Sequence, residues 1–94
     1  MKVLIDKTFE KDVSKVPTSA LHKKLARVIE QVIAAESPKE IHNLKKLQGY
    51  KTYYRIKLGD YRIGIEIVNN AETTENIVYF IRFLHRKDVY KYFP

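Results

Sequence analysis

Basic and aromatic side chains follow one another closely in the second half of the sequence. Cations that face one small area repel each other until an anion arrives, and arginine holds phosphate through two parallel hydrogen bonds. Tyrosine rings provide platforms on which bases stack. These residue types therefore predict a surface that holds RNA. In chain order they are Tyr54, Arg55, Lys57, Tyr61, Arg62, Arg82, His85, Arg86, Lys87 and Tyr90.

The distribution of charge supports an anionic partner. Residues 1–41 hold eight basic and six acidic residues, whereas residues 42–94 hold ten basic and five acidic residues, and the net charge is +7. A basic half attracts nucleic acid, an anionic membrane surface or an acidic protein. Basic residues also alternate on exposed strands because they prevent edge-to-edge aggregation, so charge alone leaves the partner open.

Several chemistries lack the residues they need. The chain has no cysteine, which excludes a thiol nucleophile and favours a cytoplasmic protein. Its histidines have no metal-ligand spacing, its acidic residues are scattered, and no phosphate-binding glycine loop is present. No apolar run approaches a membrane span. We therefore expect no cofactor, no metal and no membrane contact.

Two helices are predicted in the first half, after a short strand at Lys2–Ile5. Thr8 is a candidate cap for the first helix, whose apolar face carries Phe9, Val13 and Val16 before Pro17 interrupts it. Thr18 or Ser19 caps the second helix, which continues to about residue 36. Its apolar stripe consists of Leu21, Leu25, Val28, Ile29, Val32 and Ile33.

The second half changes to the alternation that is typical of strands. Strands are predicted at Tyr53–Leu58, Tyr61–Val68 and Ile77–Leu84, with a tight turn at Gly59-Asp60. Period two puts Arg55, Lys57 and Arg62 opposite the face that carries Tyr54 and the isoleucines. A connection at residues 41–49 precedes the strands, and Leu44 and Leu47 hold it to the core. A short helix is expected in the tail, residues 85–94.

These elements predict an α+β fold in one domain that spans residues 1–94. The apolar faces of the helical hairpin and the sheet bury each other. The expected order is β-α-α-β-β-β with a short C-terminal helix. The N-terminal strand belongs to an antiparallel sheet, and the helices cover one of its faces. The basic face is left open or only partly covered by the tail. So short a chain leaves no room for an enclosed ligand cavity, and function is expected on a surface.

Three segments together resemble the RelE/ParE toxin superfamily, and most of all its RelE-like branch. They are Leu44-Lys45-Lys46-Leu47-Gln48-Gly49, Tyr54-Arg55-Ile56-Lys57-Leu58-Gly59-Asp60-Tyr61-Arg62-Ile63 and His85-Arg86-Lys87-Asp88-Val89-Tyr90. The resemblance covers nearly the whole chain. It implies the toxin of a type II toxin–antitoxin system, a ribosome-dependent endoribonuclease that cleaves mRNA in the A site and inhibits translation.

The resemblance also implies a site. The catalytic residues of the family fall on Arg55, Lys57, Arg62, Arg86 and Tyr90, with His85 beside them, and RNA contacts are expected from Lys45, Lys46, Lys51, Tyr54, Tyr61, Arg82 and Lys87. Leu84 departs from the family pattern, which often has a small residue there.

RNA carries its own nucleophile, so a metal-free enzyme needs only to promote attack of the 2′-hydroxyl on the adjacent phosphate. Arg55 and Arg62 are suited to stabilise the charge. Either Lys57 or His85 is the base. Arg86 is suited to stabilise the leaving group electrostatically, or His85 is the acid that protonates it. Tyr90 is suited to stack on a base or orient the phosphate.

Two other functions remain open for such a chain: a ParE-like inhibitor of DNA gyrase, and a non-catalytic protein that only binds its antitoxin. The family resemblance implies a cognate antitoxin as partner, and a toxin–antitoxin complex that binds operator DNA. A surface with Val78, Phe80 and Leu84 beside Arg82 would suit an apolar, acidic segment of the antitoxin.

Overall fold

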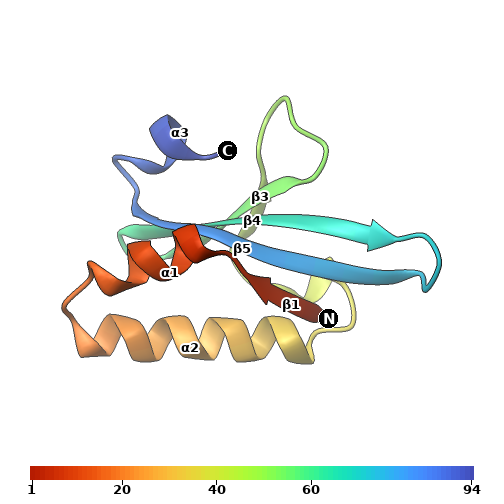
Figure 1. Ribbon diagram of the computed structural model, residues 1–94, viewed down its shortest axis with the longest axis horizontal. Helices are drawn as coiled ribbons and strands as arrows, with labels where there is room; N and C mark the ends of the chain where they lie inside the picture. Colours follow the sequence, from red (N-terminus) through yellow and green to blue (C-terminus); the bar gives the residue numbers. More distant parts are fainter.

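A five-stranded sheet forms the centre of the computed structural model, which describes residues 1–94. Helices α1 and α2 lie on one side of the sheet, and α3 lies on the other with the loop that precedes β3 (Figure 1). The elements in chain order are β1 (Lys2–Ile5), α1 (Lys7–Ser14), α2 (Ser19–Ala34), a 3-10 turn (Pro38–Glu40), β2 (Leu44–Lys46), β3 (Tyr53–Leu58), β4 (Tyr61–Asn70), β5 (Glu75–His85) and α3 (Val89–Tyr92).

The predicted α+β class is confirmed. The strand order is β1-β5-β4-β3-β2, and the antiparallel meander β3-β4-β5 has the connections that were expected. Strand β1 runs parallel to β5, so the sheet is mixed. The sequence could not reveal this direction, because a four-residue apolar run has the same pattern in either orientation.

The predicted connection at residues 41–49 was wrong in one respect, because it contains strand β2. Leu44 pairs with Ile56, Lys45 with Arg55 and Lys46 with Tyr54. Three residues are too few to show alternation, which explains why the strand was missed. The pairing extends the sheet by one strand and brings Lys45 beside Arg55.

The helices begin and end close to the expected positions, with two corrections. Helix α1 begins at Lys7 after Asp6, so Thr8 lies inside the first turn and is not the cap. Ile33, which was assigned to the apolar stripe of α2, is 54% exposed. It lies in the last turn of α2, next to the end of the helix at Ala34. None of the helices combines the length and apolarity that a membrane crossing requires.

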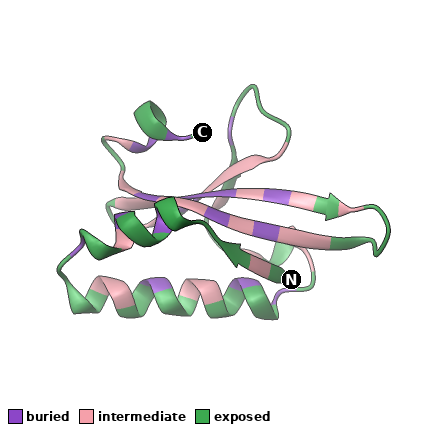
Figure 2. Ribbon diagram, in the orientation of Figure 1, coloured by how far each residue is buried: buried purple, intermediate pink, exposed green.

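The main core lies between the two long helices and the sheet. Buried residues recur along α1, α2, β4 and β5 (Figure 2). Their period of two in β5 is interrupted between Phe80 and Phe83, where the register with β4 shifts at Gly64 and Ile65. Val78 and Phe80 are fully buried in this core. They therefore cannot form the antitoxin surface that the sequence suggested for them. The core residues are Phe9, Val16, Leu25, Val32, Ile56, Ile63, Ile65, Ile67, Val78, Phe80 and Phe83.

A second, smaller apolar cluster lies on the opposite face of the sheet. Leu47, Val89 and Phe93 are its buried members, and Leu84 packs against them. Val89 and Phe93 come from the tail, so the tail covers part of the face that carries the cations. This partial cover agrees with the sequence-based expectation. It divides the face into a region under α3 and an open basic region.

Candidate functional site

The register of the sheet brings the basic residues of β2, β3 and β4 into two neighbouring rows. Lys45 pairs with Arg55, and Arg55 pairs with Gly64. Lys57 pairs with Arg62. Their strand neighbours Ile56 and Ile63 are buried under the helices, so these cations project from the opposite face. The structure thus brings Arg55, Lys57 and Arg62 together on one face, as their spacing predicts.

Arg55 is only partly satisfied by the protein. Its Nη1 donates a hydrogen bond to the carbonyl oxygen of Asn43 at 3.0 Å. Its Nε is buried and has no hydrogen-bond partner. A buried donor without a partner costs free energy, and an anion that accepts a hydrogen bond from it recovers that cost. Arg55 is therefore suited to phosphate.

Arg62 and Arg86 meet at the turn between β3 and β4. Arg62 Nη1 donates to the carbonyl oxygens of Gly59 and Tyr61, both at 2.9 Å. The backbone N–H of Arg86 donates to the carbonyl oxygen of Asp60 at 2.8 Å, and its Nε lies 4.0 Å from the Asp60 carboxylate. Gly59 has a φ of 58°, a left-handed conformation that suits glycine in this tight turn. The turn thereby holds two arginines at one end of the sheet.

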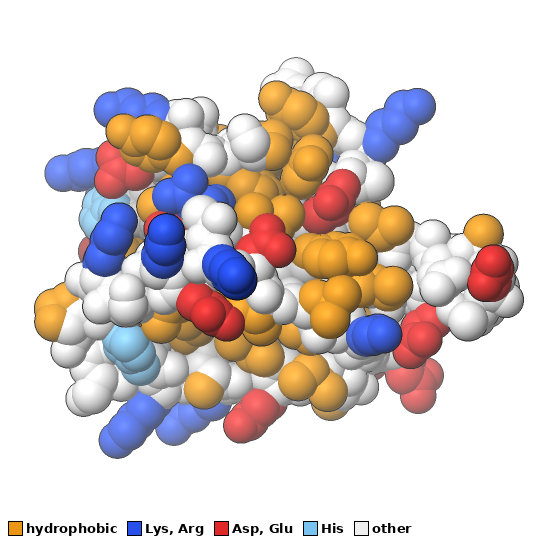
Figure 3. Space-filling view, viewed as in Figure 1, with side chains coloured by type: hydrophobic (Ala, Val, Ile, Leu, Met, Phe, Trp, Pro, Cys, Tyr) orange, Lys and Arg blue, Asp and Glu red, His pale blue; other side chains and the backbone are white.

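The open face has few acidic partners for its cations. The chain contains two ion pairs, Arg82 with Asp12 and Arg86 with Asp60. Lys45, Arg55 and Lys57 take part in neither. In Figure 3, basic side chains gather at the end of the molecule where α1 and α3 lie, and acidic ones lie near the tip of the β4–β5 hairpin. The unpaired cations can therefore attract an anionic ligand.

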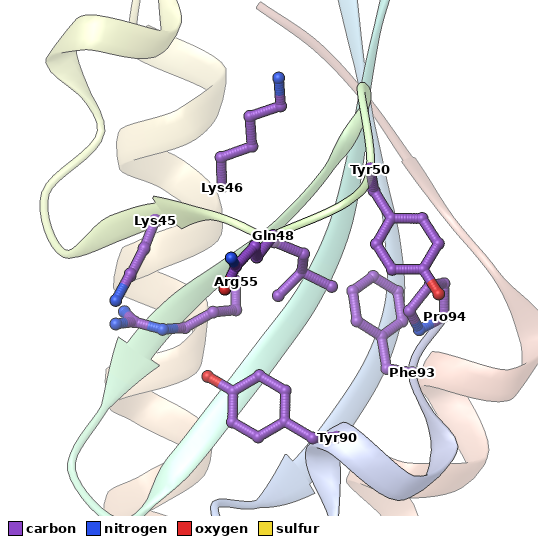
Figure 4. Close-up of a pocket in the computed structure, with 9 residues that line it drawn as sticks. Lys45, Lys46, Gln48, Tyr50, Arg55, Tyr90, Phe93 and Pro94 are labelled. Carbon is purple, nitrogen blue, oxygen red and sulfur yellow. The ribbon is translucent and has the colours of Figure 1, made fainter.

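A hollow of about 370 Å³ lies beside the basic rows. Tyr90, which is 64% exposed, extends from α3 across this hollow toward Arg55 (Figure 4). A guanidinium group on one side and an aromatic ring on the other can hold a phosphate and its base. The lining residues are Lys45, Lys46, Leu47, Gln48, Tyr50, Arg55, Tyr90, Phe93 and Pro94.

His85 lies apart from the other predicted site residues. It pairs with Tyr61 at the end of the sheet, and the two rings meet edge to face at 5.5 Å. Because Phe83 is buried under the helices, His85, two residues further along β5, projects from the helix side. It lines a second hollow of about 410 Å³ with Asp12, Arg82 and others. The structure thus separates His85 from Lys57 and Arg62.

Three of the predicted RNA-binding side chains are occupied elsewhere. Tyr54 and Tyr61 pack against the main core on the helix side, and Tyr61 stacks on Phe83 at 5.0 Å. Arg82 forms an ion pair with Asp12 at 2.7 Å and has its guanidinium 6.0 Å from the Tyr92 ring. The remaining predicted RNA-binding residues are exposed, and they are Lys45, Lys46, Lys51 and Lys87.

Sequence reasoning missed Asp12 and the aromatic lining of the hollow. Asp12 is 5% exposed although it is charged. Its signal was present, since it follows Phe9 by three residues and so lies on the apolar face of α1. Tyr50 and Phe93 showed no such signal, because both lie outside regular strands and the chain fold alone brings them together.

Comparison with known proteins defines the class to which this fold and basic face belong. The model of the ParE toxin of the type II toxin–antitoxin system, parDE, matches residues 3–90. The chain therefore belongs to the ParE toxin family of type II toxin–antitoxin systems, within the RelE/ParE superfamily.

Individual relatives carry the RelE name. The chain is 44% identical over 95 residues to Toxin RelE3 of Methanocaldococcus jannaschii, with 100% of both chains covered. A chain of the RelB–RelE antitoxin–toxin complex from Methanococcus jannaschii is 41% identical with a TM-score of 0.71, over 97% of this chain and 99% of that one. A chain of the toxin–antitoxin complex RelBE2 from Mycobacterium tuberculosis is 26% identical with a TM-score of 0.58, over 90% of this chain and 96% of that one.

Proposed function

We propose that this toxin is an endoribonuclease that cleaves mRNA on the ribosome and so inhibits translation. The observation that carries the proposal is the open face on which Arg55, Lys57 and Arg62 lie together, none of them in an ion pair. Such a cluster is suited to a phosphodiester whose negative charge increases during reaction. The similarity to Toxin RelE3 supports the same assignment.

The reaction needs three things from the protein. The 2′-hydroxyl of the RNA loses its proton and attacks the adjacent phosphorus, and the bond to the 5′-oxygen breaks. The products are a 2′,3′-cyclic phosphate and a 5′-hydroxyl. Arg55 and Arg62 hold the phosphate oxygens while charge accumulates on them. Arg86, at the neighbouring turn, stabilises the departing oxygen, which water can protonate.

Lys57 is the better candidate for the base. It pairs directly with Arg62 across the hairpin, so both side chains can reach the same phosphodiester. His85 projects from the other face of the sheet, beside Tyr61. A general base must come within hydrogen-bond reach of the proton that it removes. We therefore assign this role to Lys57 and give His85 no direct part.

Tyr90 completes the site by offering its ring to a base next to the cleaved bond. At the hollow, Tyr90 and Arg55 offer one ring and one guanidinium group to RNA, so we expect the protein alone to hold RNA weakly. The ribosome is proposed to supply the missing orientation by presenting mRNA in the A site. Such an activity requires access to ribosomes and is therefore cytoplasmic.

A cognate antitoxin is proposed as the partner that neutralises the toxin. Two structural relatives are toxin–antitoxin complexes, and their similarity to this chain covers nearly its full length. The basic open face is suited to an acidic segment of that partner. The complex of the two proteins is further proposed to bind operator DNA.

Mapping of mRNA ends tests the proposed activity. The toxin is expressed in translating cells or added to a translating extract, and primer extension locates new 5′ ends on a defined message. We expect cuts at ribosomal A sites that disappear when translation is blocked before elongation. Intact messages in a sample whose growth or translation stops would contradict the proposal.

A gyrase inhibitor is the second candidate, and the match of the ParE toxin model to residues 3–90 favours it. This function requires no phosphodiester cleavage by the toxin. It predicts DNA damage with intact messages in the same cells. A chain that only binds its antitoxin predicts neither effect, so one expression experiment separates the three functions.

A further inference from the structure

Gly64 has no side chain at a place where the ring of Phe93 lies. A carbon attached to its Cα would lie 2.7 Å from Cγ of Phe93 and 2.8 Å from both Cδ atoms, closer than such carbons approach in proteins. Its φ is not positive, so the backbone there does not require glycine. Gly64 is buried in β4 and pairs with Arg55 on one side and Arg82 on the other. The missing side chain leaves a socket between two arginines, and Phe93 fills it.

Helix α3 depends on that socket. It has only four residues, Val89–Tyr92, and one turn of helix is not stable in water without packing. Phe93 is 4% exposed and Val89 is fully buried, and together with Leu47 they form the cluster on this face. The Phe93 ring also meets Tyr53 edge to face at 5.6 Å. The docked ring thus fixes the end of the chain to the sheet.

Tyr90 lies between these two anchors, one residue after Val89 and three before Phe93. The Tyr90 side chain is exposed, so its position depends on the position of α3. In the docked arrangement it extends across the hollow toward Arg55 (Figure 4). Release of Phe93 from the socket would remove the ring from the hollow while Arg55 stayed on β3.

We propose that Gly64 is a positioning residue, whose missing side chain lets Phe93 dock and thereby holds Tyr90 opposite Arg55. The proposal rests on the assigned role of Tyr90 in RNA cleavage. It makes Gly64 a determinant of activity although Gly64 itself touches no RNA.

The first variant is Gly64→Ala, studied in the full chain. The added carbon overlaps the Phe93 ring, so we expect Lys91 and Phe93, whose amides donate within the tail, to lose protection from hydrogen exchange. Misplacement of a group in the site costs about 100-fold in cleavage. Val68→Ile is the matched control, because it also enlarges a side chain of β4 but pairs with Ile77, outside the cluster that holds α3. It should leave tail exchange and cleavage unchanged.

The Gly64→Ala substitution in a Tyr90→Ala protein distinguishes loss of Tyr90 positioning from a general loss of structure. If Gly64 acts through Tyr90, Gly64→Ala should change cleavage by no more than about twofold in a Tyr90→Ala protein. An equal loss in both backgrounds, or a tail that stays protected in Gly64→Ala, overturns the proposal. Phe93→Ala empties the socket from the other side without adding bulk to the sheet, and it replaces Gly64→Ala if that variant does not fold.

The two proposals can fail separately. If the unmodified toxin cleaves no RNA, the proposed function fails, and hydrogen exchange alone then decides whether Gly64 holds α3 in place. If the toxin cleaves and Gly64→Ala releases the tail without loss of cleavage, the role of Gly64 in positioning fails while the proposed function stands.

Discussion

At the scale of single residues, Arg62 is the proposed phosphate-binding cation with the most hydrogen bonds to the protein before RNA arrives. Two backbone carbonyls at 2.9 Å orient its guanidinium toward the β3–β4 turn. We expect Arg62→Ala to lower mRNA cleavage by about 100-fold, because it removes one preorganised donor to the phosphate. Primer extension measures the loss. The domain should remain folded, because Arg62 belongs to neither apolar cluster.

Arg86→Ala tests the same turn from the segment that follows β5. The Arg86 side chain is 59% exposed, and its ion pair with Asp60 is long, at 4.0 Å. Because such an exposed pair contributes little, the substitution should change the free energy of unfolding by no more than about 1 kcal/mol. Growth arrest on expression should be relieved, as it should be for Arg62→Ala. Full toxicity of both variants would rule out the assigned site. Asp60→Ala, which removes the partner carboxylate but no cation, is the control and should remain toxic.

Lys57 and His85 make opposite predictions about the base. Lys57→Met keeps much of the volume of the side chain but removes its nitrogen, and we expect cleavage to fall by about 100-fold or more. His85→Gln should cleave nearly as well as the unmodified protein, because its side chain projects from the other face. A single-turnover cleavage assay on programmed ribosomes compares them. A larger loss for His85→Gln would reverse the assignment.

The separation of these two residues also shows how far the sequence could define the site. Period two placed Arg55, Lys57 and Arg62 correctly, since strict alternation in a hairpin fixes both faces and register. The side of the sheet on which His85 lies was not predicted, because β5 was expected to end at Leu84, whereas it continues through His85. One more residue of strand places the imidazole on the helix side.

At the scale of elements, one buried carboxylate closes an exposed sheet edge. Strand β1 pairs with β5 only as far as Phe80. Beyond it, Asp12 of α1 accepts hydrogen bonds from the N–H of Phe83 at 2.9 Å and from Nε of Arg82 at 2.7 Å. The Asp12 carboxylate thus accepts the backbone hydrogen bond that a longer β1 would have accepted from this edge of β5.

We expect Asp12→Ala to lower the free energy of unfolding by about 3 kcal/mol, because it leaves a half-buried guanidinium and a buried N–H without partners. Urea unfolding followed by circular dichroism measures this change. Glu10→Ala, on the exposed side of the same helix, should change it by less than about 0.5 kcal/mol. Equal effects of the two substitutions would mean that Asp12 contributes only helix propensity.

This contact lay beyond sequence reasoning for a physical reason. Its partners are 70 residues apart for the ion pair and 71 for the backbone bond. Local patterns carry helix and strand identity, and they sufficed for α1, α2 and the meander. The pairing of β1 with β5, and the docking of Phe93 over Gly64, depend on where distant elements pack.

At the scale of the whole molecule, the sheet divides the structure into a packed side and a charged side. The helices bury the isoleucine face, which leaves the opposite face to the unpaired cations and the tail. The overall charge of +7 attracts RNA from a distance but does not decide where it binds. The register of β2, β3 and β4 decides where RNA binds, because it gathers the cations on one face.

Salt dependence distinguishes that local surface from the overall charge. We expect binding of a short single-stranded RNA, measured by fluorescence anisotropy, to weaken as salt rises. Lys45→Ala removes a cation that pairs with Arg55, and should reduce the slope of log affinity against log salt by about 0.7, the value for one phosphate contact. Lys23→Ala removes the same charge from the exposed surface of α2, on the helix side of the sheet, and should leave the slope unchanged. Equal slopes for the two variants would mean that RNA responds to net charge rather than to this face.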